Sequence, residues 1–222
     1  MKIRGIALLA ALLLGGCFSI NSDIEVGDGQ SVDGSLNTIN GQVSVGSESV
    51  VDGNAKTVNG SISIGARSIV EHIETVNGKI TLGAGAQADS IEAVNGSVEI
   101  GEKAQVGGVV ETVNGRVLVG RDAVVEGLIE SINGQIRLSG ATAGALRNVR
   151  GGMVLEAGSR VLGELRVVKG SNGESDDSVL VEIYADCEVA GPLVFERPVR
   201  LRIHESATIG AIQGAEPEYF SG

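Results

Sequence analysis

The sequence has no tryptophan, and aromatic residues make up only 2% of its 222 positions. This scarcity excludes a compact globule built on large aromatic side chains. Only two cysteines are present, Cys17 and Cys187, so a framework of several disulfides is excluded as well. Glycine is abundant instead, with 34 residues, and 42% of the chain is hydrophobic. A stack of narrow aliphatic layers fits this composition.

Positive charge is also in short supply. The chain has 17 Lys and Arg against 28 Asp and Glu, a formal net charge of -11. An acidic body disfavours nucleic acid as a partner and disfavours electrostatic adhesion to anionic lipid. We expect no nucleic-acid partner, no cofactor and no small-molecule substrate.

The N-terminus has the pattern of a secretion signal. Lys2 and Arg4 precede the apolar run 5–14, which is too short for the roughly 20 residues that span a bilayer. The run closes on Leu14-Gly15-Gly16-Cys17, which resembles a bacterial lipobox. This resemblance implies a lipoprotein signal peptide over 1–16, acylation (palmitate) at Cys17 and, because Phe18 is not Asp, an outer-membrane anchor facing the periplasm. The alternative is an ordinary signal peptide in which Cys17 is incidental.

One short motif recurs along the first two thirds of the chain. It ends in Asn-Gly and returns in steps of 18 or 19 residues, a period typical of repeat architectures. The residues after each Asn-Gly alternate between polar and aliphatic, as a half-buried strand does, and two further short strands fit into each repeat. The six asparagines are Asn40, Asn59, Asn77, Asn95, Asn114 and Asn133.

These repeats predict an all-β fold, a single-stranded parallel β-helix (β-solenoid) with triangular coils of 18–19 residues and about ten coils in all. We expect a lipidated cysteine and short tether over 17–23, a regular solenoid over 24–140 and an irregular continuation over 141–214. Within that continuation, 171–177 is predicted to be a loop. Residues 215–222 lie outside the period and are predicted to be a C-terminal tail, either a terminal cap or an interaction segment.

The Asn-Gly pairs are predicted to form the corners of the coils, because both residue types tolerate a positive φ angle. Stacked in register, their side chains could also form a hydrogen-bonded ladder. An aliphatic residue precedes each Asn, for example Val76 before Asn77. Strict alternation of inward and outward side chains would expose these residues as a stripe, which would mark a partner surface. An aliphatic residue or Ala recurs at about every sixth position through these residues, and this register favours their turning inward instead.

Four glutamates, each three residues before an Asn, form a second column: Glu74, Glu92, Glu111 and Glu130. Carboxylates stacked about 4.8 Å apart should raise one another's pKa values unless a cation lies between them. The column is either a solvated acidic face or a divalent-cation face. We assign no metal ligands.

Catalytic chemistry is hard to find in this sequence, so we expect no enzyme. The two histidines, His72 and His204, are each predicted to be solvated surface residues. His72 is the one candidate base for a hexapeptide-type acyltransferase. That activity, or a carbohydrate-active enzyme, is a remote alternative.

The coils around residues 104–111, 116–120 and 123–130 resemble those of bactofilins. The resemblance implies a right-handed triangular β-helix that forms polymers. We therefore expect a non-enzymatic, membrane-anchored envelope lipoprotein with a structural, scaffold or self-assembly role, in which end coils with unpaired edges associate. The alternative is a module that binds a glycan or divalent cation on its acidic face.

Overall fold

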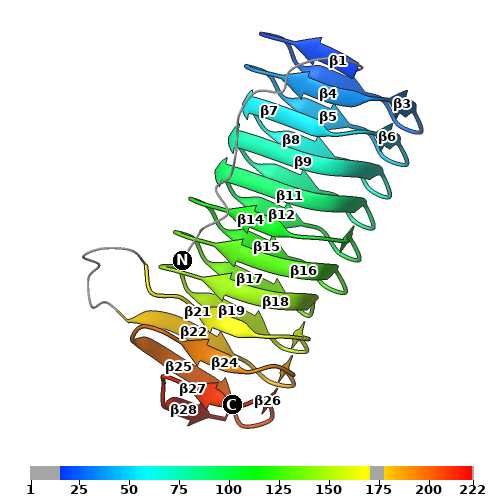
Figure 1. Cartoon of the computed structure of the whole chain (residues 1–222). Helices are drawn as coiled ribbons and strands as arrows, with labels where there is room; N and C mark the ends of the chain where they lie inside the picture. Colours follow the sequence, from blue (N-terminus) through cyan, green and yellow to red (C-terminus); the bar gives the residue numbers. More distant parts are fainter. Residues whose placement is uncertain (1–15, 171–177, 222) are drawn as a thin grey trace.

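The computed structural model is one parallel β-solenoid, and it describes residues 16–170 and 178–221. Its coils stack along one axis from the N-terminal to the C-terminal end (Figure 1). Every strand pairing between coils is parallel, and the described residues contain no helix, so none could span a membrane. The predicted all-β solenoid of about ten coils is confirmed. The predicted signal peptide 1–16 and loop 171–177 lie almost wholly outside the described residues.

Each coil gives one strand to an 11-stranded sheet, here called the single-strand sheet. Its strands succeed one another in chain order, and partners stand 18 or 19 residues apart in the regular part, as Ile80 does from Ile62. The strands are β2 (Ile24–Val26), β5 (Val43–Val45), β8 (Ile62–Ile64), β10 (Ile80–Leu82), β12 (Val98–Ile100), β15 (Val117–Val119), β17 (Ile136–Ser139), β19 (Met153–Glu156), β22 (Val179–Ile183), β25 (Val199–His204) and β28 (Pro217–Phe220).

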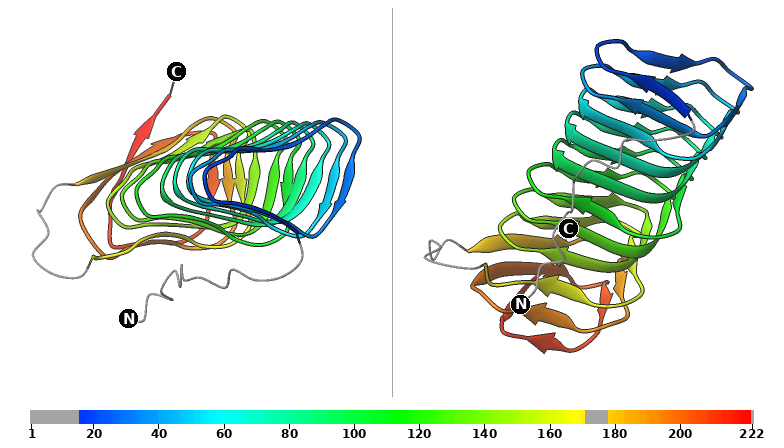
Figure 2. Two further views of the ribbon diagram at one scale, coloured as in Figure 1. Left: turned by 90° about the horizontal axis from the view of Figure 1, so that it is seen from above. Right: turned by 45° about the horizontal axis from the view of Figure 1, so that its top comes forward.

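The other two strands of each coil belong to a 17-stranded sheet, the double-strand sheet. They run together into one long strand in four places, so the coil is flatter than the predicted triangle (Figure 2). The strands are β1 (Gly16–Ser19), β3 (Ser31–Asp33), β4 (Ser35–Thr38), β6 (Val50–Asp52), β7 (Ala55–Asn59), β9 (Ile69–Asn77), β11 (Gln87–Asn95), β13 (Gln105–Val106), β14 (Val110–Thr112), β16 (Val124–Ser131), β18 (Thr142–Asn148), β20 (Arg160–Val161), β21 (Leu165–Val167), β23 (Glu188–Val189), β24 (Leu193–Phe195), β26 (Thr208–Ile209) and β27 (Ile212–Gln213).

The core is a set of aliphatic columns between the two sheets. In β8 and β10 the first and third residues are buried and the middle one faces outward, which is the period of two expected from the sequence. Burying each Val, Ile or Leu contributes about 1.5–3 kcal/mol. Phe195 is the one buried aromatic residue of the described chain, so the core needs almost none.

Both ends of the part of the chain that the structure describes are built into the solenoid. Residues 16–19, which we placed mostly in the tether, form β1 and pair with β4. Residues 217–220, which we placed in a tail, form β28 and pair with β25, so that Phe220 lies opposite His204. The irregular part continues the coils, as expected, because β19 to β27 pair in the same order.

The chain turns between the two sheets at two kinds of corner. The positive φ angles that we predicted for Asn-Gly occur at the corner that contains no Asn-Gly. The turn from the single-strand sheet into the double-strand sheet contains a left-handed residue in successive coils, such as Glu48 with φ 59° and Lys103 with φ 57°. None of the six Asn-Gly pairs has a positive φ, so that prediction is wrong.

The glycine of each Asn-Gly pair is needed for space instead. A Cβ on Gly96 would lie 1.7 Å from the carbonyl oxygen of Gly78, and one on Gly60 would lie 1.8 Å from that of Gly41. No side chain fits at such distances. The backbones of adjacent coils approach closely here, and glycine is the residue that permits it.

Candidate functional site

The Asn-Gly corners carry a continuous ladder of side-chain amides. Each Asn donates from Nδ2 to the Oδ1 of the Asn in the preceding coil, at 2.7–2.9 Å, from Asn133 back to Asn40. The ladder is one rung longer at each end than the sequence indicated. Asn40 donates to Asn21, and Arg150 Nη1 donates to Asn133 Oδ1 at 3.1 Å. Asn21 stands 19 residues before Asn40, so its spacing was the available signal.

A second hydrogen-bonded column runs inside the same corner. The Thr57 hydroxyl donates to the carbonyl oxygen of Gly41 at 2.9 Å, and Thr75 donates to Gly60 at 3.1 Å. Asn148 does the same to Gly134 through Nδ2. These buried polar side chains satisfy the carbonyl groups of the close corner, which would otherwise be costly to bury.

The aliphatic residues before each Asn face outward, so the expectation that they turn inward is wrong. Thr57 is buried while Val58 is 39% exposed, and Val76, Val94, Val113 and Ile132 are half-buried. Strict alternation continues to the corner because the inward position is used by the Thr column. The result is an aliphatic stripe between the Asn ladder and the glutamate column.

The four glutamates are stacked in register along the outside of the double-strand sheet. A cation closes the column at each end. Lys56 Nζ lies 2.8 Å from a Glu74 oxygen, and Arg147 Nη1 lies 3.4 Å from Glu130 Oε2. The two middle glutamates have carboxylates as their column neighbours on both sides.

Those middle groups have raised pKa values. Partial burial raises the pKa of Glu92 most, followed by the charges of Glu74 and Glu111, while Lys56 and His72 lower it. Glu111 is raised by partial burial and by Glu130 and is lowered by Arg147. The fold thus holds charged groups together at a cost in free energy. Even so, no group of three or more His, Cys, Asp and Glu in the described ranges is arranged to hold a metal ion.

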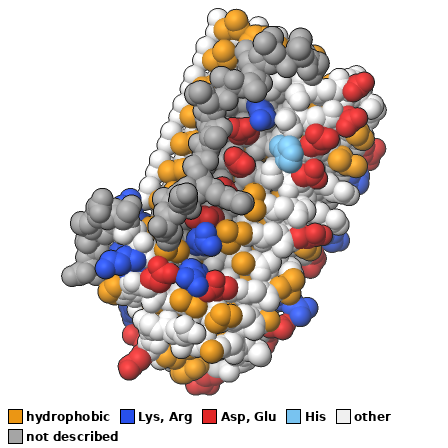
Figure 3. All heavy atoms as spheres, viewed as in Figure 1, with side chains coloured by type: hydrophobic (Ala, Val, Ile, Leu, Met, Phe, Trp, Pro, Cys, Tyr) orange, Lys and Arg blue, Asp and Glu red, His pale blue; other side chains and the backbone are white. Residues whose placement is uncertain are grey.

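The same sheet carries a second acidic column that the sequence analysis missed. Asp33 pairs with Asp52 in register, and Glu71, Asp89 and Glu126 follow them in later coils on exposed outward positions. It lies next to the glutamate column, three residues upstream at Glu71 and Asp89 and four residues upstream at Glu126, and this nearly constant spacing was the signal. Acidic side chains surround a histidine on the face drawn in Figure 3. His72 lies between the two columns, exposed, with Nδ1 2.8 Å from Ser90 Oγ. Because it stands on an open sheet face, it has no enclosure that would exclude water.

The other predicted site residues lie apart. Cys17 is an exposed free thiol in β1, whereas Cys187 is buried, and burial raises the pKa of its thiol. His204 is half-buried with its ring edge-on to Phe220, and not simply solvated as expected.

A scan against protein-family models, a search of curated proteins and a search of solved structures each found no match for this chain.

Replacing Glu92 by Gln should stabilise the protein at neutral pH. The folded-state pKa of Glu92 is raised, so its contribution to stability is lost as pH rises through that value, and the charged form destabilises the fold at pH 7. We expect Glu92→Gln to raise the free energy of unfolding by about 0.5–1 kcal/mol at pH 7. The gain should shrink as pH falls from 7 through the raised pKa of Glu92, and it should vanish below about pH 4, where wild-type Glu92 is protonated in both the folded and the unfolded state.

Thermal melts at both pH values measure this effect. Glu74→Gln is the matched control, because it removes a carboxylate from the same column but also breaks the ion pair with Lys56. It should gain less than Glu92→Gln or lose stability. An equal gain from both variants would contradict the repulsion argument.

Proposed function

We propose that this chain is a non-enzymatic, lipid-anchored solenoid of the bacterial cell envelope that acts as a structural or scaffold element and assembles through its ends. One observation carries the proposal: in the described residues the coils stack through the length of the body, and the strands of the first and last coils have a partner on one side only. Unpaired strand edges are templates for pairing with another chain.

The C-terminal end has the features of an open edge. Strands β26, β27 and β28 each pair only with the preceding coil within the part of the chain that the structure describes. Ile209, Ile212 and Ala215 pack against the core and stay partly exposed, because no further described coil covers them. A second solenoid end placed here would bury apolar surface and complete the strand pairing.

The N-terminal end supports attachment to lipid. Strands β1, β2 and β3 form its edge in the described residues. Cys17 lies in β1, and Phe18 and Ile20 beside it are 48% and 54% exposed. If Cys17 is acylated, each buried methylene of the chains contributes about 0.8 kcal/mol, and the first coil stands directly at the membrane surface.

The resemblance of the middle coils to bactofilins supports an assembly role, since those proteins form polymers. End-to-end contacts between unlike ends produce open filaments when the rotation between copies does not close a ring. The acylated end would restrict growth to the other end at a membrane. Assembly and anchoring can therefore be tested separately.

Assembly is tested on the soluble body, residues 18–222. Sedimentation and electron microscopy across protein concentration should show growth from monomers to larger species. Ile212→Lys places a charge at the open C-terminal end and should prevent this growth. Ile69→Lys is the control, because Ile69 is 43% exposed on the side of the solenoid and the variant should assemble normally. A monomer at every concentration of wild-type protein would contradict the proposal.

The lipid anchor is tested by labelling of Cys17. In bacteria fed radiolabelled palmitate, the wild-type protein should incorporate label and fractionate with the membranes. Cys17→Ser should incorporate none and should be released in soluble form. Cys187→Ser is the control, since that thiol is buried. Equal labelling of wild type and Cys17→Ser would contradict lipidation at this residue.

A further inference from the structure

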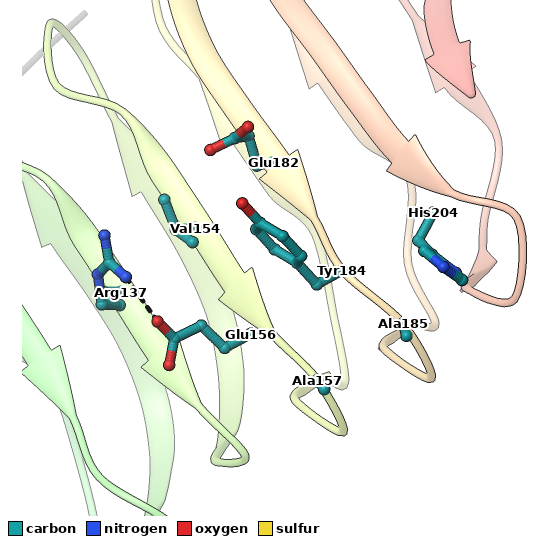
Figure 4. Close-up of a pocket in the computed structure, with 8 residues that line it drawn as sticks. All are labelled: Arg137, Val154, Glu156, Ala157, Glu182, Tyr184, Ala185 and His204. Carbon is teal, nitrogen blue, oxygen red and sulfur yellow. Dashed lines mark hydrogen bonds and ion pairs between the residues drawn. The ribbon is translucent and has the colours of Figure 1, made fainter. Parts of the chain in front are cut away.

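A partly open depression of about 410 Å³ lies on the outer face of the single-strand sheet in the C-terminal half of the solenoid. Its volume is within the range of small-ligand sites, about 300–1,000 Å³. Four successive strands of this sheet and the turns after them supply its walls (Figure 4). The lining residues include Arg137 from β17, Val154 and Glu156 from β19, Glu182 from β22, Tyr184 just after β22 and His204 from β25.

Aromatic rings gather at this place although the chain has few of them. The sequence has three Phe and two Tyr, and the core uses Phe195 alone. Tyr184 lies in the depression, 38% exposed, with its ring 5.7 Å from the Phe220 ring and nearly perpendicular to it. His204 makes a similar edge contact with Phe220, at 5.3 Å. Phe220 therefore supports two rings that contribute nothing to the aliphatic core.

The charged groups around the rings are paired with one another. Arg137 Nη1 lies 2.5 Å from Glu156 Oε1, and Glu156 also accepts a hydrogen bond from the Ser139 hydroxyl. Glu182 is paired with Arg202 at 2.6 Å, and the Arg202 guanidinium lies 4.9 Å from the centre of the Phe220 ring. The Arg137 pair is drawn in Figure 4, where the Tyr184 hydroxyl points toward Val154 and Glu182.

This combination selects among classes of ligand. An ionic ligand would meet carboxylates and guanidinium groups that already neutralise each other. A purely apolar ligand would cover those groups without offering them hydrogen bonds, which is costly. A neutral sugar ring has a face of C–H groups that can pack on an aromatic ring, and hydroxyls at its edge that can both donate to Glu and accept from Arg.

We propose that this depression binds a neutral saccharide. The ring of Tyr184 packs against the C–H face of one sugar unit, and Arg137, Glu156 and Glu182 bond to its hydroxyls. Because the depression lies on the outer face of the sheet and is partly open, it suits a unit within a longer glycan. This site is separate from both acidic columns and goes beyond the scaffold role, which requires no ligand.

Calorimetric titration of the full-length protein with three neutral oligosaccharides, cellotetraose, maltotetraose and tetra-N-acetylchitotetraose, tests the proposal. The protein with its proposed lipid anchor is kept in solution by a detergent without a sugar head group, because a sugar head group would compete with the oligosaccharide for the depression. We expect saturable binding of at least one oligosaccharide. Tyr184→Ala should weaken it about tenfold, the loss expected for one ring contact.

Tyr219→Ala is the matched control, because Tyr219 is 60% exposed on β28 and does not line the depression. Its affinity should equal that of the wild type. If Tyr184→Ala lowers the melting temperature, Arg137→Ala tests the opposite wall, and it too should weaken binding. The proposal is overturned if none of the three oligosaccharides binds, or if Tyr219→Ala weakens binding as much as the variants in the depression.

Discussion

The rest of this structure depends on the close approach of adjacent coils at the Asn-Gly corner. Strands in a sheet are about 4.8 Å apart, and every coil must keep this spacing through its turns as well as its strands. At the corner, the backbone of one coil passes so near the carbonyl group of the next that only glycine fits, as at Gly78 and Gly96. At the corner between Gly60 and Gly78, the bond from Asn77 to Asn59 outside and the bond from Thr75 to Gly60 inside join the same two coils. A register set at the corner fixes the position of every other column.

In-register stacking has a cost as well as a benefit. It places aliphatic residues upon one another in the core, and it places Glu92 between two other carboxylates on the surface. The cost is limited because Lys56 and Arg147 close the two ends of the glutamate column. In the later coils, where the spacing of the repeat varies, the surface carries ion pairs between Arg and Glu of adjacent coils. Aromatic rings lie together there on the outer face of the single-strand sheet.

The fold was predictable because Asn-Gly recurs at a fixed spacing and Val or Ile alternates after it, which only stacked coils explain. The part of the raised Glu92 pKa that comes from Glu74 and Glu111 was foreseeable from the register and the strand spacing, whereas its largest cause, partial burial, was not. The role of glycine at the corner was not, because the carbonyl group that excludes a side chain there belongs to another coil. The side chain of Val58 was expected to turn inward for a related reason. It faces outward because Thr57 takes the inward position and bonds to Gly41 of the preceding coil. The depression beside Tyr184 could not be found either, since its residues come from coils of unequal length.

One pair of substitutions tests the central claim most directly. Gly96→Ala introduces a Cβ 1.7 Å from the Gly78 carbonyl oxygen, whereas Gly107, in the next coil, has no atom within 4 Å of the same added group. Thermal unfolding of the two variants should show a large drop in melting temperature for Gly96→Ala and almost none for Gly107→Ala. If both variants melted like the wild type, the corner contact would not be the constraint on which the coils depend.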